Sequence, residues 1–211
     1  MVILLGGLMS EAAVAQADAG VRLSHYIFDH FMKGTVLLKS GSVNEEELNY
    51  NSLTSEMVFN DNGKYLAIAN PMDVDTITIL SRQFVPVSKG FYEVLVHGPT
   101  PLYVEYSCLI KEPGADIGYG MNSNTSATAP LKSLIQSGGA YSLKLPDGFQ
   151  PIPQHNFLIQ RNGKFLPANN ARQLGAVFPD KKAWIGQYIK DKHPDLKKIE
   201  DLVALVQGLE Q

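Results

Sequence analysis

The chain has 211 residues, of which 45% are hydrophobic and 18% charged, a balance that suits a globular protein with a substantial core. Its formal net charge is −3, so no overall electrostatic field attracts nucleic acid or an anionic bilayer. The sequence contains no run of 18 apolar residues, so no segment is predicted to cross a membrane as a helix.

The first 17 residues resemble the end of a signal peptide. Val2–Leu8 is a short apolar run, and Ala13–Ala17 contains two of the small-x-small sites that a signal peptidase accepts. A positively charged start is missing and Glu11 lies inside the stretch, so we expect the natural start to lie upstream. The alternative is an N-terminal helix buried in the fold. We predict a signal-peptide remnant at 1–17, followed by an N-terminal lead-in over 18–30.

The lead-in contains two histidines and an aspartate that would approach one another on a helix. His25 and Asp29 would be one turn apart with His30 nearby, a loose arrangement for a divalent metal ion. The alternative is an amphipathic segment in which Tyr26-Ile27-Phe28 packs on the following domain. We favour this alternative because the set of metal ligands is incomplete, so neither a metal nor another cofactor is predicted.

Residues 31–167 are predicted to form a β-rich domain. Turn signals recur at about ten-residue spacing with no helical pattern between them, which indicates antiparallel strands joined by tight connections. We therefore predict an α+β fold, mostly an antiparallel β meander of barrel- or sandwich-like form, followed by three short C-terminal helices. The expected hairpin connections are Ser40-Gly41-Ser42, Asn60-Asp61-Asn62-Gly63 and Arg161-Asn162-Gly163. The expected strands are 34–39, 43–50, 56–59, 64–69, 76–80, 83–87, 91–97, 102–110, 141–145, 156–160 and 164–167.

Cys108 is the only cysteine, so the chain cannot form an internal disulfide bond. In an extended strand it shares one face with Leu102, Val104, Tyr106 and Ile110. This position predicts a buried, inert thiol rather than a nucleophile.

A long segment rich in glycine, serine and asparagine, 112–140, interrupts the strands. Loops of this length in compact domains are usually functional or disordered. Tyr119, Asn122 and Asn124 are candidates to contact a ligand, including a glycan, through stacking and amide hydrogen bonds. A loop without a ligand is the simpler interpretation.

Residues 168–211 are predicted to form a helical tail packed on the β domain. The second helix is expected to be capped near Asp180 and to end at His193-Pro194. Helices this short are marginal alone, so they need a partner surface. The three apolar stripes consist of Leu174, Val177 and Phe178, then Trp184, Ile185, Tyr188 and Ile189, then Ile199, Leu202, Val203 and Val206.

The tail also concentrates positive charge. Six lysines lie between positions 181 and 198, one third of all lysine and arginine in the chain. Lys190 and Lys192 are candidates to contact an acidic partner or anionic lipid headgroups. A solvated helix surface is the simpler interpretation.

Short motifs are spread along the chain at Phe31-x-Lys33-Gly34-x-Val36, Leu48–Asn51, Glu56-Met57-x-Phe59, Phe91–Leu95, Gly118–Gly120, Phe178–Lys182 and Ile199–Val203. Together they resemble uncharacterised exported proteins of Bacteroidetes. This resemblance implies a Gram-negative envelope or periplasmic location, but it carries no known activity and no catalytic residue. It also implies that Asp75-Thr76-Ile77 matches a pattern for O-glycosylation at Thr76. The alternative is that Thr76 only begins a strand.

Three functions stay open at this point. The leading hypothesis is a non-catalytic, exported envelope protein that binds or scaffolds, with an envelope protein or a glycan as partner. It implies no nucleic acid and at most peripheral membrane contact. The first alternative is a hydrolase of envelope or extracellular glycans, whose acid and base would meet only in the fold. The second is a small-molecule carrier with an apolar cavity.

Overall fold

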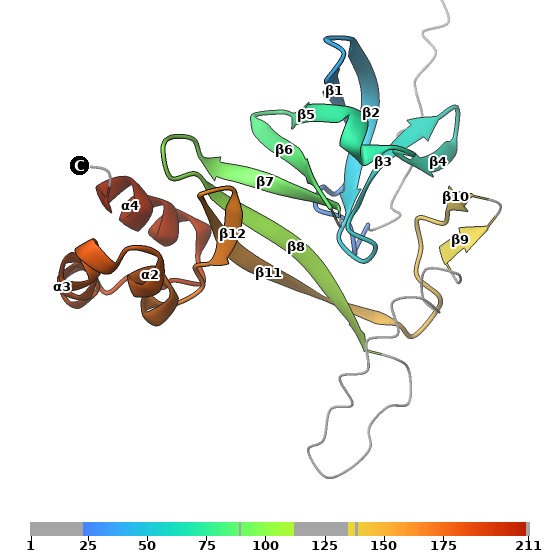
Figure 1. The fold of residues 1–211 in the computed structure, drawn as a ribbon. Coiled ribbons are helices and arrows are strands. Elements are labelled where there is room, and N and C mark those ends of the chain that lie inside the picture. Colours follow the sequence, from blue (N-terminus) through green and yellow to red (C-terminus); the bar gives the residue numbers. More distant parts are fainter. Residues whose placement is uncertain (1–22, 89, 112–134, 138, 210–211) are drawn as a thin grey trace, which may run out of the picture.

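The computed structural model describes residues 23–88, 90–111, 135–137 and 139–209. The predicted signal-peptide remnant and the candidate ligand residues Tyr119, Asn122 and Asn124 therefore lie outside the described residues. Within them, the α+β prediction is confirmed: a large antiparallel sheet is followed by three C-terminal helices (Figure 1). No helix in the described ranges is long and apolar enough to cross a bilayer.

The sheet has 12 strands in the order β12-β11-β8-β7-β6-β5-β1-β2-β3-β4-β10-β9, and it is open, with β12 and β9 at its two edges. Two meanders, β1 to β4 and β5 to β8, meet where β5 pairs with β1. The strands are β1 (Met32–Leu38), β2 (Val43–Asn51), β3 (Glu56–Asp61), β4 (Lys64–Ala67), β5 (Val74–Ile79), β6 (Arg82–Val87), β7 (Gly90–Val96), β8 (Leu102–Lys111), β9 (Gln136–Ser137), β10 (Ala140–Tyr141), β11 (Gln150–Arg161) and β12 (Lys164–Pro167).

The part of the sheet from β1 to β7 curls on itself without closing (Figure 1). The ring of Tyr50 on β2 stacks on that of Phe84 on β6 at 6.0 Å between ring centroids, although two strands, β5 and β1, separate them in the sheet order. At the start of β7, Gly90 has φ +140°, and a Cβ atom there would lie 2.2 Å from the backbone oxygen of Ser55. Only glycine permits this approach between β7 and the β2–β3 connection.

The predicted hairpins are confirmed, and the residues at their turns explain why they form. Asn62 and Gly63 have φ of 51° and 87°, and Asn162 and Gly163 have φ of 52° and 74°. Two successive positive φ values define the turn that matches the twist of paired strands, and the Asn-Gly pair tolerates them. Gly41, at φ 88°, serves the β1–β2 connection.

Two strand predictions need correction. The strand expected over 141–145 is only the two-residue β10, Ala140–Tyr141. The strand expected over 156–160 begins six residues earlier, at Gln150, and pairs with β8 from Gln150 to Ile159. Pro151 and Pro153 hid this extension, since proline usually argues against a strand. Pro151 and Pro153 lie two residues apart, so the backbone positions at which they lack an N–H group point to the same side of β11. On that side β12 pairs only with Leu158–Arg161, so both prolines lie at an unpaired edge and are tolerated.

The three predicted helices form at the expected places and pack at one end of the long β8–β11 pair (Figure 1). The side chain of Asn170 caps the first by accepting from the Gln173 N–H. The expected cap near Asp180 is wrong, because a 3₁₀ turn fills that position and the second helix has no side-chain cap. The helical elements are η1 (Pro71–Asp73), α2 (Ala171–Val177), η2 (Pro179–Lys181), α3 (Lys182–Lys192) and α4 (Ile199–Leu209).

The inner face of the sheet is covered along most of its length. At one end, helices α2 to α4 bury apolar residues of β7, β8 and β11. In the middle, the curl buries residues of β1, β2, β3, β5, β6 and β7. A third cluster joins the lead-in to β3, β8 and β10, and it holds Cys108 at 6% exposure, which confirms the predicted buried thiol.

Candidate functional site

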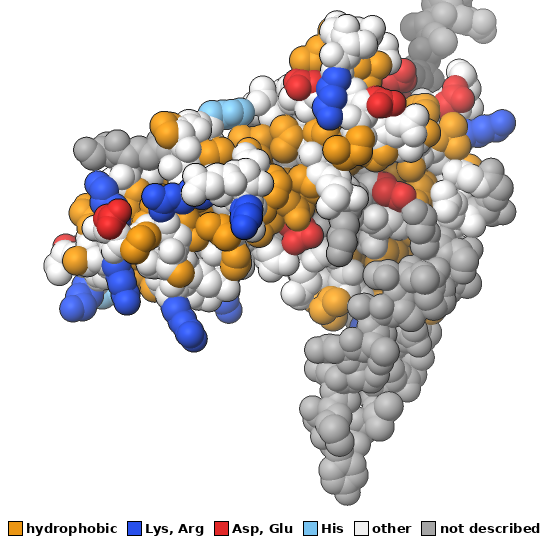
Figure 2. Space-filling view, viewed as in Figure 1, with side chains coloured by type: hydrophobic (Ala, Val, Ile, Leu, Met, Phe, Trp, Pro, Cys, Tyr) orange, Lys and Arg blue, Asp and Glu red, His pale blue; other side chains and the backbone are white. Residues whose placement is uncertain are grey.

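Over β5 to β8 and β12, no helix or strand of the described residues packs on the opposite, outer face. Side chains alternate between the two faces of each strand, so the neighbours of buried residues point outward. On β7, Phe91 and Glu93 are buried while Tyr92 and Val94 are partly exposed. Figure 2 shows hydrophobic side chains gathered across the middle of the molecule, between the helices and the curled strands.

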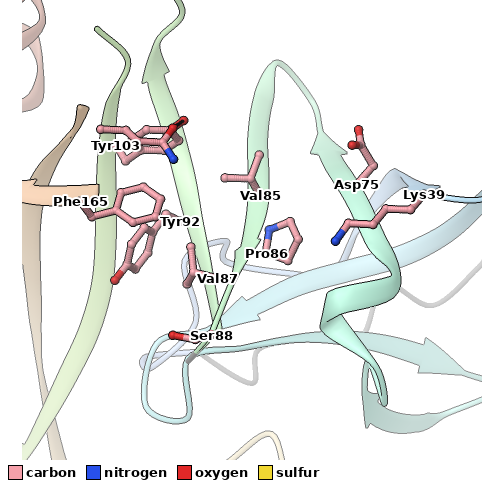
Figure 3. A pocket seen from close by; sticks show the side chains of 10 residues that line it. Lys39, Asp75, Val85, Pro86, Val87, Ser88, Tyr92, Tyr103 and Phe165 are labelled. Carbon is pink, nitrogen blue, oxygen red and sulfur yellow. Dashed lines mark hydrogen bonds between the residues drawn. The ribbon is translucent and has the colours of Figure 1, made fainter. Parts of the chain in front are cut away.

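A groove of about 400 Å³ lies on this outer face. We call it the aromatic groove. Figure 3 shows three rings gathered at one end, Lys39 and Asp75 at the other, and Val85 and Pro86 between them. The groove is lined by Lys39, Asp75, Val85, Pro86, Val87, Ser88, Tyr92, Tyr103, Gln160 and Phe165.

The three rings come from β7, β8 and β12, three strands that the sheet brings close together although β12 pairs with neither of the other two. Phe165 on β12 meets Tyr92 on β7 at 5.1 Å between ring centroids, with an interplanar angle of 88°. It meets Tyr103 on β8 at 5.2 Å and 80°. Edge-to-face contacts of this kind hold the rings in fixed orientations, and Tyr103 is buried beneath them at 8% exposure. Tyr92 and Phe165 are half-buried, so a ligand can reach them.

Polar groups border the rings. The Tyr103 hydroxyl donates to Oε1 of Gln160 at 3.1 Å, which leaves the amide NH₂ group of Gln160 as a donor for a ligand. Burial, together with the nearby Glu105 charge, raises the pKa of Tyr92, so its phenol stays a neutral donor and acceptor at physiological pH. The hydroxyl of Ser88 and the exposed Asp75 complete a lining that mixes apolar and hydrogen-bonding surface.

The inner face holds a second group of interest, a buried ion pair. Arg82 donates from Nε and Nη2 to the two carboxylate oxygens of Glu93, at 2.7 Å each. The Tyr106 hydroxyl donates to the same carboxylate at 2.7 Å. The Arg82 guanidinium lies 4.8 Å from the ring centre of Phe28. Both oxygens of Glu93 are thus engaged, so this carboxylate is held as a structural partner rather than as a free base.

A third group, which we call the buried polar cluster, joins the lead-in to the β2–β3 connection. Ser52 donates to the backbone oxygen of His25 from its N–H at 2.9 Å and from its hydroxyl at 2.7 Å. Five buried polar atoms here, on His25, Tyr26, Asn51 and Thr54, have no partner with good hydrogen-bond geometry among the described residues. Such a gathering of unpaired donors and acceptors is typical of a place that holds ordered water.

The lead-in does not form the helix that would bring His25, Asp29 and His30 together. It runs as turns and bends, with His25 buried and the other two residues exposed. In the described part of the chain, no group of three or more metal-ligating side chains gathers. The expected packing of the lead-in is confirmed, because Tyr26 is buried and both Ile27 and Phe28 pack on the core of the curl.

The other candidate residues lie apart from the aromatic groove or at its edge. Thr76 is half-buried on β5, and its hydroxyl donates to the carboxylate of Asp75 at 3.1 Å. Lys190 and Lys192 are exposed in the last turn of α3, where positive charge also complements the helix dipole. Glycosylation at Thr76 and partner contact by these lysines stay predictions.

Comparison of the chain with models of protein families, with curated proteins and with solved structures returned no match. Function is therefore inferred from the chemistry of the groove itself. Its residues were absent from the candidates found in the sequence. The outward positions of Tyr92 and Tyr103 follow from strand alternation, but which strands lie side by side, and which face stays uncovered, depends on contacts distant in sequence.

Proposed function

We propose that the protein is an exported, non-catalytic binding module of the bacterial envelope, and that its aromatic groove holds a glycan. The observation that carries this proposal is the combination of half-buried rings with amide, carboxylate, hydroxyl and ammonium groups in one open groove.

The chemistry of a sugar matches this combination. One face of a sugar ring presents C–H bonds, which pack on aromatic rings such as those of Tyr92 and Phe165. Its edge presents hydroxyls, which pair with groups such as the Gln160 amide and the Asp75 carboxylate. An open, shallow groove suits a ligand that keeps part of its surface in water, whereas a strongly apolar ligand favours an enclosed cavity.

Binding to an array of neutral and acidic oligosaccharides tests the proposal. We expect the wild-type protein to bind a subset of glycans, and Tyr92→Ala and Phe165→Ala each to weaken that binding about tenfold through loss of one stacking surface. Ile152→Ala is the matched control, because Ile152 is an apolar residue of β11, 45% exposed, outside the groove. Thermal unfolding of each variant separates lost contacts from lost folding.

Other outcomes would replace the proposal. Binding of proline-rich peptides in place of glycans would identify a peptide-binding groove, since such peptides also dock on aromatic surfaces. Appearance of new reducing ends in a bound glycan would favour the hydrolase hypothesis. A wild-type protein that binds no glycan, or variants that bind as well as wild type, would contradict glycan binding in the groove.

The export part of the proposal is supported by the sequence alone. The small-x-small sites at Ala13–Ala17 predict a mature N-terminus near Gln16 or Asp18. Mass spectrometry of protein isolated from its native cells should find that end in the envelope fraction. Recovery of chains that retain Met1 from the cytoplasm would contradict export without bearing on the groove.

A further inference from the structure

A second hollow, of about 270 Å³, opens on the inner face of the sheet, opposite the face that carries the aromatic groove. Its floor consists of the buried side chains Val36, Leu48 and Val74, with exposures of 6%, 0% and 0%. Its walls include the half-buried Phe59 and Ile68. The hollow is therefore an apolar recess at the open end of the curl.

The recess exists because β2 runs past the end of the core. Its residues Val43–Glu47 are exposed, and burial begins only at Leu48. The turn η1 forms the opposite wall, and it is tied to the β1–β2 connection by the Lys39 N–H, which donates to the Asp73 backbone oxygen at 2.9 Å. Two separate backbone segments thus hold the recess open above the core.

The rim of the recess is acidic. Glu46 on β2 and Asp73 on η1 both line it and are exposed. Asn44 and Asn70 add two amides, and no lysine or arginine occurs among the described residues that line the recess. An apolar floor below two carboxylates complements a ligand with an apolar chain and a positively charged end.

We propose that this recess binds a small amphiphilic amine, a short alkyl chain that ends in an ammonium group. The chain would cover Val36, Leu48 and Val74, and the ammonium group would lie between Glu46 and Asp73. The volume lies at the lower end of the range for ligand sites, which suits one short chain rather than a peptide helix or a long lipid tail. The proposal is independent of glycan binding because it concerns the other face of the sheet.

Titration of the isotope-labelled full chain with n-hexylammonium, n-hexanol and n-hexanoate, followed by amide chemical shifts, tests the proposal. We expect saturable shifts at Val36, Leu48 and Val74, with hexylammonium binding at least threefold more tightly than hexanol, and hexanoate the weakest. Affinity should rise about fourfold for each methylene group added from butyl- to hexylammonium. Added salt should weaken hexylammonium but not hexanol.

Variants that neutralise one carboxylate test whether the acidic rim contacts the ammonium group. Glu46→Gln should lower the affinity for hexylammonium about threefold and leave hexanol unchanged. Glu45→Gln is the matched control, because Glu45 is the next residue of β2 and its side chain lies on the other face. Ala69→Trp, at an exposed position of the lining, should fill the recess and abolish binding of both ligands.

Three results would overturn the proposal. They are the absence of saturable shifts with hexylammonium, hexanoate binding as tightly as hexylammonium, and equal effects of Glu45→Gln and Glu46→Gln. Because the variants sit in exposed positions, thermal unfolding should show each of them folded like wild type.

Discussion

Burial keeps the imidazole of His25 uncharged in the native protein. It lowers the pKa of His25 from 6.5 to about 4, because the charged ring would lose its hydration in the buried site. Between these two values the unfolded chain binds more protons than the folded one, so stability falls as the pH falls. The contribution of uncharged His25 to the free energy of unfolding is complete above about pH 6.5 and is lost as the pH falls towards 4. Its full size is about 3 kcal/mol.

His25→Leu should remove this pH dependence. Urea unfolding between pH 4.5 and 7.5 should show the wild type losing stability in acid, and the variant losing about 2 kcal/mol less. At neutral pH the variant should be nearly as stable as wild type, since neither ring nitrogen of His25 has a hydrogen-bond partner among the described residues. His97→Gln, at an exposed histidine, is the control and should follow the wild-type curve. Parallel curves for wild type and His25→Leu would refute this role of His25.

The ion pair between Arg82 and Glu93 is the other residue-scale feature with a clear energetic consequence. Burial acts to lower the pKa of Arg82, but the hydrogen bonds and charge of Glu93 outweigh it, so the pKa lies above its ordinary value. Burial and the Glu93 charge likewise raise the pKa of Tyr106. The side chain of Glu93 is only 7% exposed, so it depends on Arg82 for compensation.

Arg82→Leu should therefore cost about 3–5 kcal/mol, because it leaves the Glu93 carboxylate buried without its cation. Glu93→Leu alone should also destabilise, and the double variant should lose less than the sum of the two single losses. Chemical denaturation of the four proteins gives the coupling energy directly. Additive losses would show that the pair does not act as a unit.

At the scale of elements, local turn chemistry accounts for what the sequence could predict. Asn62-Gly63 and Asn162-Gly163 specify their hairpins because few residue pairs accept two positive φ values. The C-terminal helices follow from apolar stripes and stops such as His193-Pro194. The early start of β11 was not predictable in this way, since Pro151 and Pro153 are acceptable only where one side of the strand stays unpaired.

The helices are predicted to be an integral cap on the sheet. Leu205 of α4 is fully buried among residues of β7, β8 and β11, so Leu205→Ala should cost about 2–5 kcal/mol and shift a single unfolding transition. Gln207→Ala, exposed on the same helix, should change stability by less than about 0.5 kcal/mol. Two separate transitions, with Leu205→Ala moving only one, would contradict an integral cap.

Trp184 is less deeply buried in this cap than its place in an apolar stripe predicts. It is only half-buried, where it stacks on Tyr188 at 5.0 Å and closes over Gly208. The fully buried side chains of these helices are Leu174, Leu202, Leu205 and Val206. A stripe shows which side of a helix packs, but the depth of each position depends on the neighbouring elements.

At the scale of the whole molecule, the sheet presents two different faces. Helices and curl cover most of the inner face and leave one acidic, apolar recess at its open end. The outer face, which no described helix covers, carries the aromatic groove (Figure 3). Tyr92 and Phe165 are 73 positions apart, so their contact depends on strand order, which local patterns do not encode.

We expect this outer face to be the surface that binds a glycan. Titration of the wild-type protein with oligosaccharides released from its native envelope, followed by amide chemical shifts, would identify the surface that binds. We expect the largest shifts at Tyr92, Gln160 and Phe165 and none along α3. Shifts confined to α3 around Lys190 and Lys192, or no shifts at saturating glycan, would contradict the claim.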